Sequence, residues 1–125
     1  MKAKRILIVD DEEDIRDVAK LALETLGGWQ VLTASSGSQG LLVAEQEQPD
    51  AILLDVMMPD MDGVRTFQKL QANRATQNIP VILLTAKVQS ADQRRFDELG
   101  VKAVIAKPFK TMSLANQIAE IFNWD

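Results

Sequence analysis

The feature that most constrains the fold is a regular alternation of short apolar runs with longer segments of helical periodicity. The runs are rich in Ile, Leu and Val and span residues 5–10, 30–34, 51–55, 81–85 and 103–107. Runs of this length without polar–apolar alternation are typical of strands buried on both faces of a parallel sheet. Because a helical pattern follows each run, we predict five β-α units.

The helical segments are marked by apolar residues at i, i+3 and i+4 spacing. The first ends at Gly27 and presents one apolar face, formed by Ile15, Val18, Ala19, Ala22, Leu23 and Leu26. The others are predicted before Pro49, around 64–70, over about 90–99 and around 114–122. Five strands alternating with helices imply an α/β fold, in which a parallel sheet is covered by helices on both faces.

Length and composition limit the possible functions. The chain has 125 residues, of which 46% are apolar, and it contains no linker or low-complexity segment, so we predict one domain over 1–125 with no output domain. Eighteen acidic and fourteen basic residues give a net charge of -4, which argues against nucleic acid or an anionic membrane as the main partner. Without Cys or His, the chain has neither a thiolate nor an imidazole metal ligand.

The N-terminus does not resemble a targeting segment. The apolar run that starts at Ile6 is interrupted at Asp10. A secretory signal needs an apolar stretch of about 7–15 residues, and a membrane-spanning helix needs about 20. We therefore expect a soluble, cytoplasmic protein.

Reactive or charged side chains follow four of the five predicted strands. They are Asp10 and Asp11, Asp55, Thr85 and Lys107. Each alone has a simpler explanation, such as a helix cap, a turn residue or a solvated charge. Because the carboxyl ends of parallel strands meet at one edge of the sheet, the coincidence of all four predicts a functional crevice there.

Three carboxylates in one crevice call for a cation. Two unit charges about 4 Å apart interact with about 4 kcal/mol at an effective dielectric constant of about 20. All-oxygen ligands select a hard ion, and few carboxylates with room for water and phosphate suit Mg²⁺. The loop at 55–63 lacks the alternating oxygen ligands and closing Glu of an EF-hand, so we reject a calcium loop.

These motifs together resemble the receiver domain of two-component response regulators. The resemblance covers the whole chain and rests on "DD" at 10–11, "LLDVMMPDMDG" at 53–63, "LTA" at 84–86 and "KPF" at 107–109. It implies a flavodoxin-like, three-layer (βα)5 sandwich with strand order 2-1-3-4-5, the order found in chemotaxis receivers.

The resemblance also implies a role for each site residue. Asp55 is the expected phosphoacceptor, and Asp10 and Asp11 are the expected Mg²⁺-binding pair, with Asp11 the preferred direct ligand and Asp10 often acting through water. The backbone carbonyl of Met57 completes the protein's metal ligands. Thr85 is expected to hydrogen-bond the phosphoryl group, and Lys107, followed by a cis peptide bond to Pro108, to pair with it.

Two positions need separate mention. The residue three before the lysine is usually Tyr or Phe in the family, and its ring turns inward on phosphorylation; here it is Val104, so the usual aromatic switch is in doubt. Two residues after Thr85 stands Lys87, which can reach the phosphoryl group or remain a solvated loop lysine.

We therefore interpret the chain as a single-domain response regulator that takes a phosphoryl group from a sensor histidine kinase or a histidine phosphotransfer protein and signals by binding another protein. It is not expected to be an enzyme beyond Mg²⁺-dependent self-phosphorylation and autodephosphorylation. The alternative is an interaction module that keeps the fold without phosphorylation. An aspartyl phosphatase is disfavoured because Met57 occupies the place of its acid/base catalyst. A flavodoxin is disfavoured because no Ser/Thr/Gly-rich loop follows the first strand.

Overall fold

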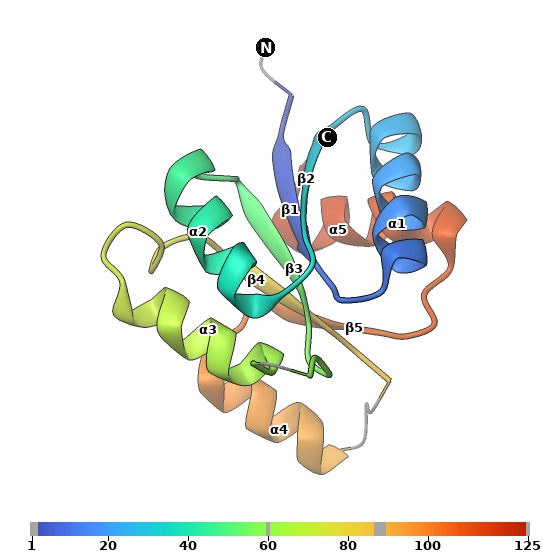
Figure 1. The fold of residues 1–125 in the computed structure, drawn as a ribbon. Coiled ribbons are helices and arrows are strands. Elements are labelled where there is room, and N and C mark those ends of the chain that lie inside the picture. The colour runs from blue at the N-terminus through green and yellow to red at the C-terminus, as the bar shows by residue number, and fades with distance from the viewer. Residues whose placement is uncertain (1–2, 60, 87–89, 125) are drawn as a thin grey trace.

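Five strands alternate with five helices, as the sequence predicts (Figure 1). The computed structural model describes residues 3–59, 61–86 and 90–124. The strands are β1 (Arg5–Val9), β2 (Gln30–Ala34), β3 (Ala51–Asp55), β4 (Val81–Thr85) and β5 (Ala103–Ala106). The helices are α1 (Glu13–Leu26), α2 (Gly37–Glu47), α3 (Gly63–Ala72), α4 (Ser90–Leu99) and α5 (Thr111–Phe122). Asp10 and Lys107 directly follow β1 and β5, as predicted, whereas Asp55 and Thr85 are the last residues of β3 and β4.

The sheet is parallel throughout, with the strand order β2-β1-β3-β4-β5. This confirms the predicted fold class and strand order. The middle strands β3 and β4 are buried along their full length, including their last residues, Asp55 and Thr85. The carboxylate and the hydroxyl are therefore held by a rigid, buried backbone.

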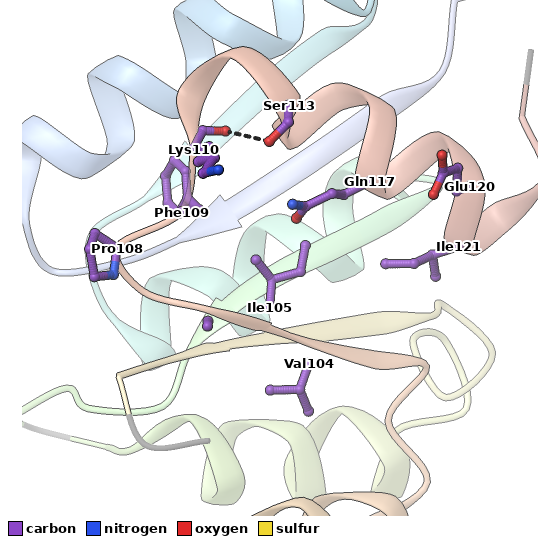
Figure 2. A pocket seen from close by; sticks show the side chains of 10 residues that line it. Val104, Ile105, Pro108, Phe109, Lys110, Ser113, Gln117, Glu120 and Ile121 are labelled. Carbon is purple, nitrogen blue, oxygen red and sulfur yellow. Dashed lines mark hydrogen bonds between the residues drawn. The ribbon is translucent and has the colours of Figure 1, made fainter. Parts of the chain in front are cut away.

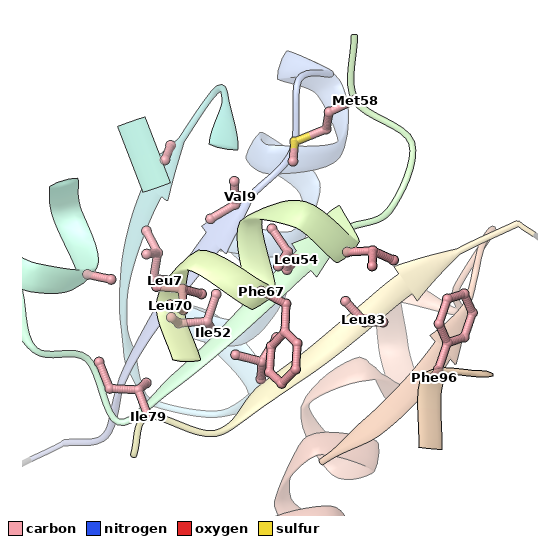
Figure 3. Close-up of a cluster of buried hydrophobic side chains, with 14 residues drawn as sticks. Leu7, Val9, Ile52, Leu54, Met58, Phe67, Leu70, Ile79, Leu83 and Phe96 are labelled. Atoms are coloured by element: carbon pink, nitrogen blue, oxygen red, sulfur yellow. The ribbon is translucent and has the colours of Figure 1, made fainter. Parts of the chain in front are cut away.

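Alternate residues of the strands build two apolar layers. One layer lies under α2, α3 and α4 and is drawn in Figure 3, where Leu7, Ile52 and Leu83 pack with Phe67 and Phe96 from the helices. The other lies under α1 and α5, where strand residues Ile6, Ile8 and Leu53 meet Leu23, Leu114 and Ile118. Helices cover both faces of the sheet, which confirms the three-layer arrangement.

The predicted apolar face of α1 is only partly buried. Ala19, Ala22 and Leu23 are buried, but Val18 and Leu26 are 42% and 48% exposed. With Leu21 and Met112, these two residues line a shallow apolar groove of about 310 Å³ between α1 and α5. Ala19, Ala22 and Leu23 are buried because α1 packs on the sheet and on α5, and Val18 and Leu26 lie beyond that contact.

An aromatic cluster lies at the edge of the sheet opposite to the strand ends. Trp29, which precedes β2, meets Trp124 edge to face with 5.3 Å between ring centroids, and Phe122 stacks on Trp124. The Lys4 ammonium lies 5.2 Å from the Trp124 ring centroid. The two ends of the described chain are thus packed together. Among the described residues, no helix combines the length and apolar character needed to cross a membrane.

Candidate functional site

Asp10 is the most firmly held residue of the site. It is fully buried, and its backbone N–H donates to the Ala34 carbonyl, which continues the β1–β2 pairing by one residue. Its Oδ1 accepts from the Glu12 N–H at 2.9 Å, and its Oδ2 accepts from Lys107 Nζ at 2.7 Å. Both carboxylate oxygens are therefore engaged, and their positions are fixed by the chain.

Arg16 of α1 adds a contact that sequence reasoning missed. Its Nη1 donates to the backbone carbonyl of Asp10 at 2.8 Å. The guanidinium thereby ties the first turn of α1 to the loop that presents Asp10 and Asp11. The available signal was a single arginine in the acidic stretch "DDEEDIRD", but periodicity does not tell which backbone atom such a side chain reaches.

Asp55 ends β3 and is only 2% exposed. Lys107 Nζ lies 3.2 Å from its Oδ1, and the Met57 N–H donates weakly to the same oxygen at 3.4 Å. The chain can turn sharply here because Gly63 starts α3 against the end of the strand. A Cβ at residue 63 would overlap with the Asp55 carbonyl oxygen, so no larger residue fits without a backbone shift.

The three predicted acids converge. Asp10, Asp11 and Asp55 each offer a carboxylate oxygen, and these oxygens lie within 4.8 Å of one another. Asp11 is the exposed member, whereas the other two are buried. This donor set is all oxygen, carries three negative charges and is open to solvent on the Asp11 side, so it fits a hard divalent cation such as Mg²⁺ that keeps several waters.

Lys107 partly neutralises this cluster by bridging Asp10 and Asp55. Burial alone would lower the pKa of its ammonium, but the hydrogen bond and charge of Asp10, with a smaller contribution from Asp55, raise the pKa above its usual value. The ammonium therefore stays charged at neutral pH. The peptide bond to Pro108 is cis, as the resemblance predicts, and the Lys107 N–H donates to the Thr85 carbonyl at 2.9 Å.

The pKa of Asp55 reflects the surplus of negative charge. Burial, followed by the charge of Asp10, raises its pKa from 3.8 to about 6, although Lys107 and the Met57 N–H act in the opposite direction. The lysine lowers the pKa of Asp55 by less than burial and the neighbouring carboxylate together raise it. A bound cation would favour the ionised, nucleophilic form of Asp55.

For the remaining predicted residues, the structure gives a position in the fold but does not test the predicted role. Thr85 is 1% exposed at the end of β4, next to the strand that carries Asp55. Met57 follows Asp55 by two residues, and its side chain is 61% exposed; the ligand role of its carbonyl stays a prediction. Lys87 lies outside the described residues.

A cavity of about 620 Å³ is lined by ten residues, none of which belongs to the acid cluster (Figure 2). It is formed by β5, the segment after Lys107 and α5, and its lining includes Ile105, Pro108, Phe109 and Gln117. Val104 also borders it but belongs to the apolar layer under α4. The cavity contains no carboxylate of the site, so the reactive geometry lies at the strand ends.

A family model described as the response regulator receiver domain matches residues 6–119. The chain is 38% identical over 118 residues to the alkaline phosphatase synthesis transcriptional regulatory protein PhoP of Bacillus subtilis, a match that covers 94% of this chain and 48% of that protein. It is 40% identical over 105 residues to the DNA-binding dual master transcriptional regulator RpaA of Synechocystis, covering 84% of this chain and 43% of that protein. The chain thus spans less than half the length of these relatives.

Solved structures agree with this match. A putative response regulator from Chloroflexus aurantiacus superposes with a TM-score of 0.87 at 29% identity, covering 98% of this chain and 99% of that one. A CheY-like response regulator receiver domain protein from Methanospirillum hungatei gives a TM-score of 0.85 at 31% identity, covering 98% and 95% of the two chains.

Proposed function

The chain belongs to the response regulator receiver family, and from that premise we propose that Asp55 accepts a phosphoryl group in a Mg²⁺-dependent reaction. The observation that carries the proposal is the bridging of Asp10 and Asp55 by Lys107 in a cluster of three converging carboxylates. The site then combines a fixed nucleophile with a fixed cation, and phosphoryl transfer depends mainly on positioning and electrostatics.

Each residue has a defined part in this transfer. An oxygen of Asp55 forms a bond to phosphorus while the bond from phosphorus to the donor atom breaks, and the donor leaves with that bonding pair. Lys107 stabilises the charge of the phosphoryl oxygens, and the Thr85 hydroxyl donates a hydrogen bond to one of them. Asp10, Asp11 and the Met57 carbonyl would hold Mg²⁺, which neutralises charge on the transferred group.

The phosphoryl donor is inferred from the family. Receiver domains are phosphorylated by histidine kinases, so we propose a sensor histidine kinase or a histidine phosphotransfer protein as the donor. We further propose that this receiver acts in the cytoplasm by binding another protein. That the chain itself binds no nucleic acid stays a prediction, based on its net charge of -4.

The proposal is tested by labelling. Incubation with Mg²⁺ and acetyl phosphate should add one phosphoryl group to the wild-type protein, measured by intact mass with rapid acid quenching. Asp55→Asn should abolish the label because an amide is not a nucleophile here, whereas Asp17→Asn, at an exposed acid of α1, should label normally. Equal labelling of Asp55→Asn and wild type would refute the assignment. A wild type that is never labelled, by acetyl phosphate or a histidine kinase, would favour the phosphorylation-independent module.

A further inference from the structure

We propose that the groove between α3 and α4 is a docking surface for an acidic segment of a partner protein. The groove has a volume of about 510 Å³ and is lined by Asp62, Val64, Arg65, Gln68, Lys69, Ala72 and Arg95. Figure 1 shows the two helices side by side on one face of the sheet. The proposal rests on charge, spacing and the absence of certain side chains from this lining.

The charge of the groove is opposite to that of the chain. Among the described residues of the lining, three exposed cations, Arg65, Lys69 and Arg95, stand against one acid, in a protein whose net charge is -4. The acid, Asp62, caps α3 by accepting the Arg65 backbone N–H at 2.8 Å. Its charge is therefore directed at the helix terminus more than at the arginine side chains.

These three cations differ from Arg5, Arg16 and Lys107, which have internal contacts. Arg5 pairs with Glu47, Arg16 donates to the Asp10 carbonyl, and Lys107 bridges two acids. Within the described residues, no carboxylate forms an ion pair with Arg65, Lys69 or Arg95. The groove cations are thus available to an external anion.

The spacing of the cations suits acidic side chains. Arg65 and Lys69 are one helical turn apart on α3, which separates them by about 6 Å along the helix axis. Carboxylates at i and i+4 of a helix have the same axial spacing, and carboxylates at i and i+2 of an extended segment are about 6.7 Å apart. Arg95 contributes a second planar guanidinium from the opposite wall, and such groups bind carboxylates through two parallel hydrogen bonds.

The length and chemistry of the groove favour protein over nucleic acid. From Asp62 to Ala72 the wall formed by α3 is about 15 Å long, which accommodates several residues of a partner. The part of the lining that the structure describes contains no aromatic side chain on which a base could stack. Buried Val64 and the methyl group of Ala72 give the groove small apolar contacts between the charges.

The first experiment is a titration of isotope-labelled protein with a capped hexaglutamate peptide, followed by amide and arginine side-chain chemical shifts. We expect saturable shifts centred on Arg65, Gln68, Lys69 and Arg95, which weaken as ionic strength rises. Shifts centred on another surface, or none at low ionic strength, would overturn the proposal.

Paired variants supply the control. The double variant Arg65→Gln/Arg95→Gln lacks two of the groove cations and should bind the peptide about tenfold more weakly. The loss is no larger because each exposed ion pair with a glutamate of the peptide contributes modestly. Lys20→Gln with Lys102→Gln removes the same number of charges from exposed lysines outside the groove and should leave affinity within about twofold. If both double variants lost the same affinity for the peptide, binding would depend only on the net charge of the protein, and the docking surface would be refuted.

Competing ligands complete the test. A hexathymidylate oligonucleotide or inorganic tripolyphosphate should bind these residues more weakly than the peptide. Tighter binding of either would overturn the assignment to an acidic protein segment. Acetyl phosphate labelling of Asp55 should be unchanged in both double variants. Peptide binding therefore tests the docking surface, and labelling tests the proposed phosphorylation, each separately from the other.

Discussion

At the scale of single residues, the site carries more negative charge, from three carboxylates, than Lys107 can neutralise. Lys107 lies 2.7 Å from Asp10 but 3.2 Å from Asp55, so the fully buried Asp10 holds the ammonium more closely. Asp55 therefore keeps a pKa raised to about 6, chiefly because it is buried and secondly because Asp10 is charged. Its protonation should be visible in the stability of the metal-free protein.

Asp55→Asn should stabilise the metal-free protein at neutral and higher pH. The folded pKa of Asp55 lies above the value of 3.8 expected for the unfolded chain, so between these values the folded state binds more protons and wild-type stability falls as pH rises. At about pH 8 the variant should gain roughly 1–3 kcal/mol, less whatever the lost pair with Lys107 contributed, and the gain should vanish near pH 4. Urea unfolding with a chelator at both pH values measures it. A gain independent of pH would contradict the raised pKa.

Arg16 should raise the affinity for Mg²⁺ by holding the Asp10 backbone in place, although its positive charge lowers that affinity. Arg16→Gln removes a positive charge near the acid cluster, which would tighten Mg²⁺ binding, and it weakens the contact that fixes the Asp10 carbonyl. We expect the second effect to dominate and the Mg²⁺ affinity to fall by about tenfold, as for other outer-shell contacts. Amide chemical shifts during a Mg²⁺ titration measure the affinity. Arg16→Lys keeps the charge and should lose less; tighter binding by Arg16→Gln would show that charge alone matters.

The meeting of the three acids with Lys107 could be predicted from sequence because each lies at the end of a strand or just after one, and a parallel sheet brings those ends together. The contact of Arg16 could not be predicted, since it depends on the rotamer of one long side chain and on the angle at which α1 leaves the loop. The same limit applies to the groove cations, whose mutual placement depends on how α4 packs beside α3.

At the scale of elements, the meeting of β3 and α3 determines the shape of the loop that follows Asp55. The Gly63 N–H donates to the Val56 carbonyl at 2.9 Å, and the Asp62 carboxylate caps the helix. A Cβ on residue 63 would come within 2.8 Å of the Val56 Cα, as well as meeting the Asp55 carbonyl. Both neighbours are backbone atoms, so a side chain cannot be accommodated by a rotamer change.

Gly63→Ala should therefore shift the end of β3 or the start of α3. We expect a loss of about 2 kcal/mol in the free energy of unfolding, typical of overpacking, together with slower labelling of Asp55 by acetyl phosphate. Ser38→Ala, at an exposed position of α2, is the control for a single added or removed atom and should change neither quantity. Normal labelling in a destabilised Gly63→Ala protein would mean that the contact serves stability alone.

The helices show where periodicity is insufficient. The spacing of apolar residues predicted α1 correctly, yet it placed Val18 and Leu26 on the buried face, and both are exposed. Periodicity gives the direction of a helix face but not its buried width, which depends on how far the sheet and α5 extend under it. The strand order likewise came from the family resemblance, because the alternation of strands and helices alone allows several orders.

At the scale of the whole molecule, the site lies at the carboxyl ends of the strands that separate the two apolar layers. Asp55 and Thr85 end the two central strands, β5 lies next to β4, and the residues of β5 alternate between the layers. Val104 packs in the layer under α4, whose other members include Phe96, and Ile105 packs under α5 (Figure 2). A change at Thr85 can therefore reach α4 through Val104 or remain in the loops at the strand ends.

Phosphorylation should change the surface of β5 and α5 less than in receivers with an aromatic residue in place of Val104. Valine has one χ angle restricted by branching, so it cannot swing a ring into space that Thr85 vacates. A conformational change shifts a partner's affinity only by the difference in its contacts between the two states. The differences should then be concentrated after Asp55 and Thr85, where the proposed phosphoryl group would contact the chain directly.

Amide chemical shifts with and without beryllofluoride, a mimic of the phosphoryl group, measure this distribution. The largest changes should fall at Val56–Met58 and at Thr85 and Ala86, with smaller ones over β5 and α5. Val104→Tyr restores a ring with a polar tip, and it should increase the changes on β5, α4 and α5 relative to wild type. If wild type already shows its largest changes around Val104 and along α5, the switch works without an aromatic residue, because the packing of Val104 against the layer under α4 is then sufficient to carry the motion.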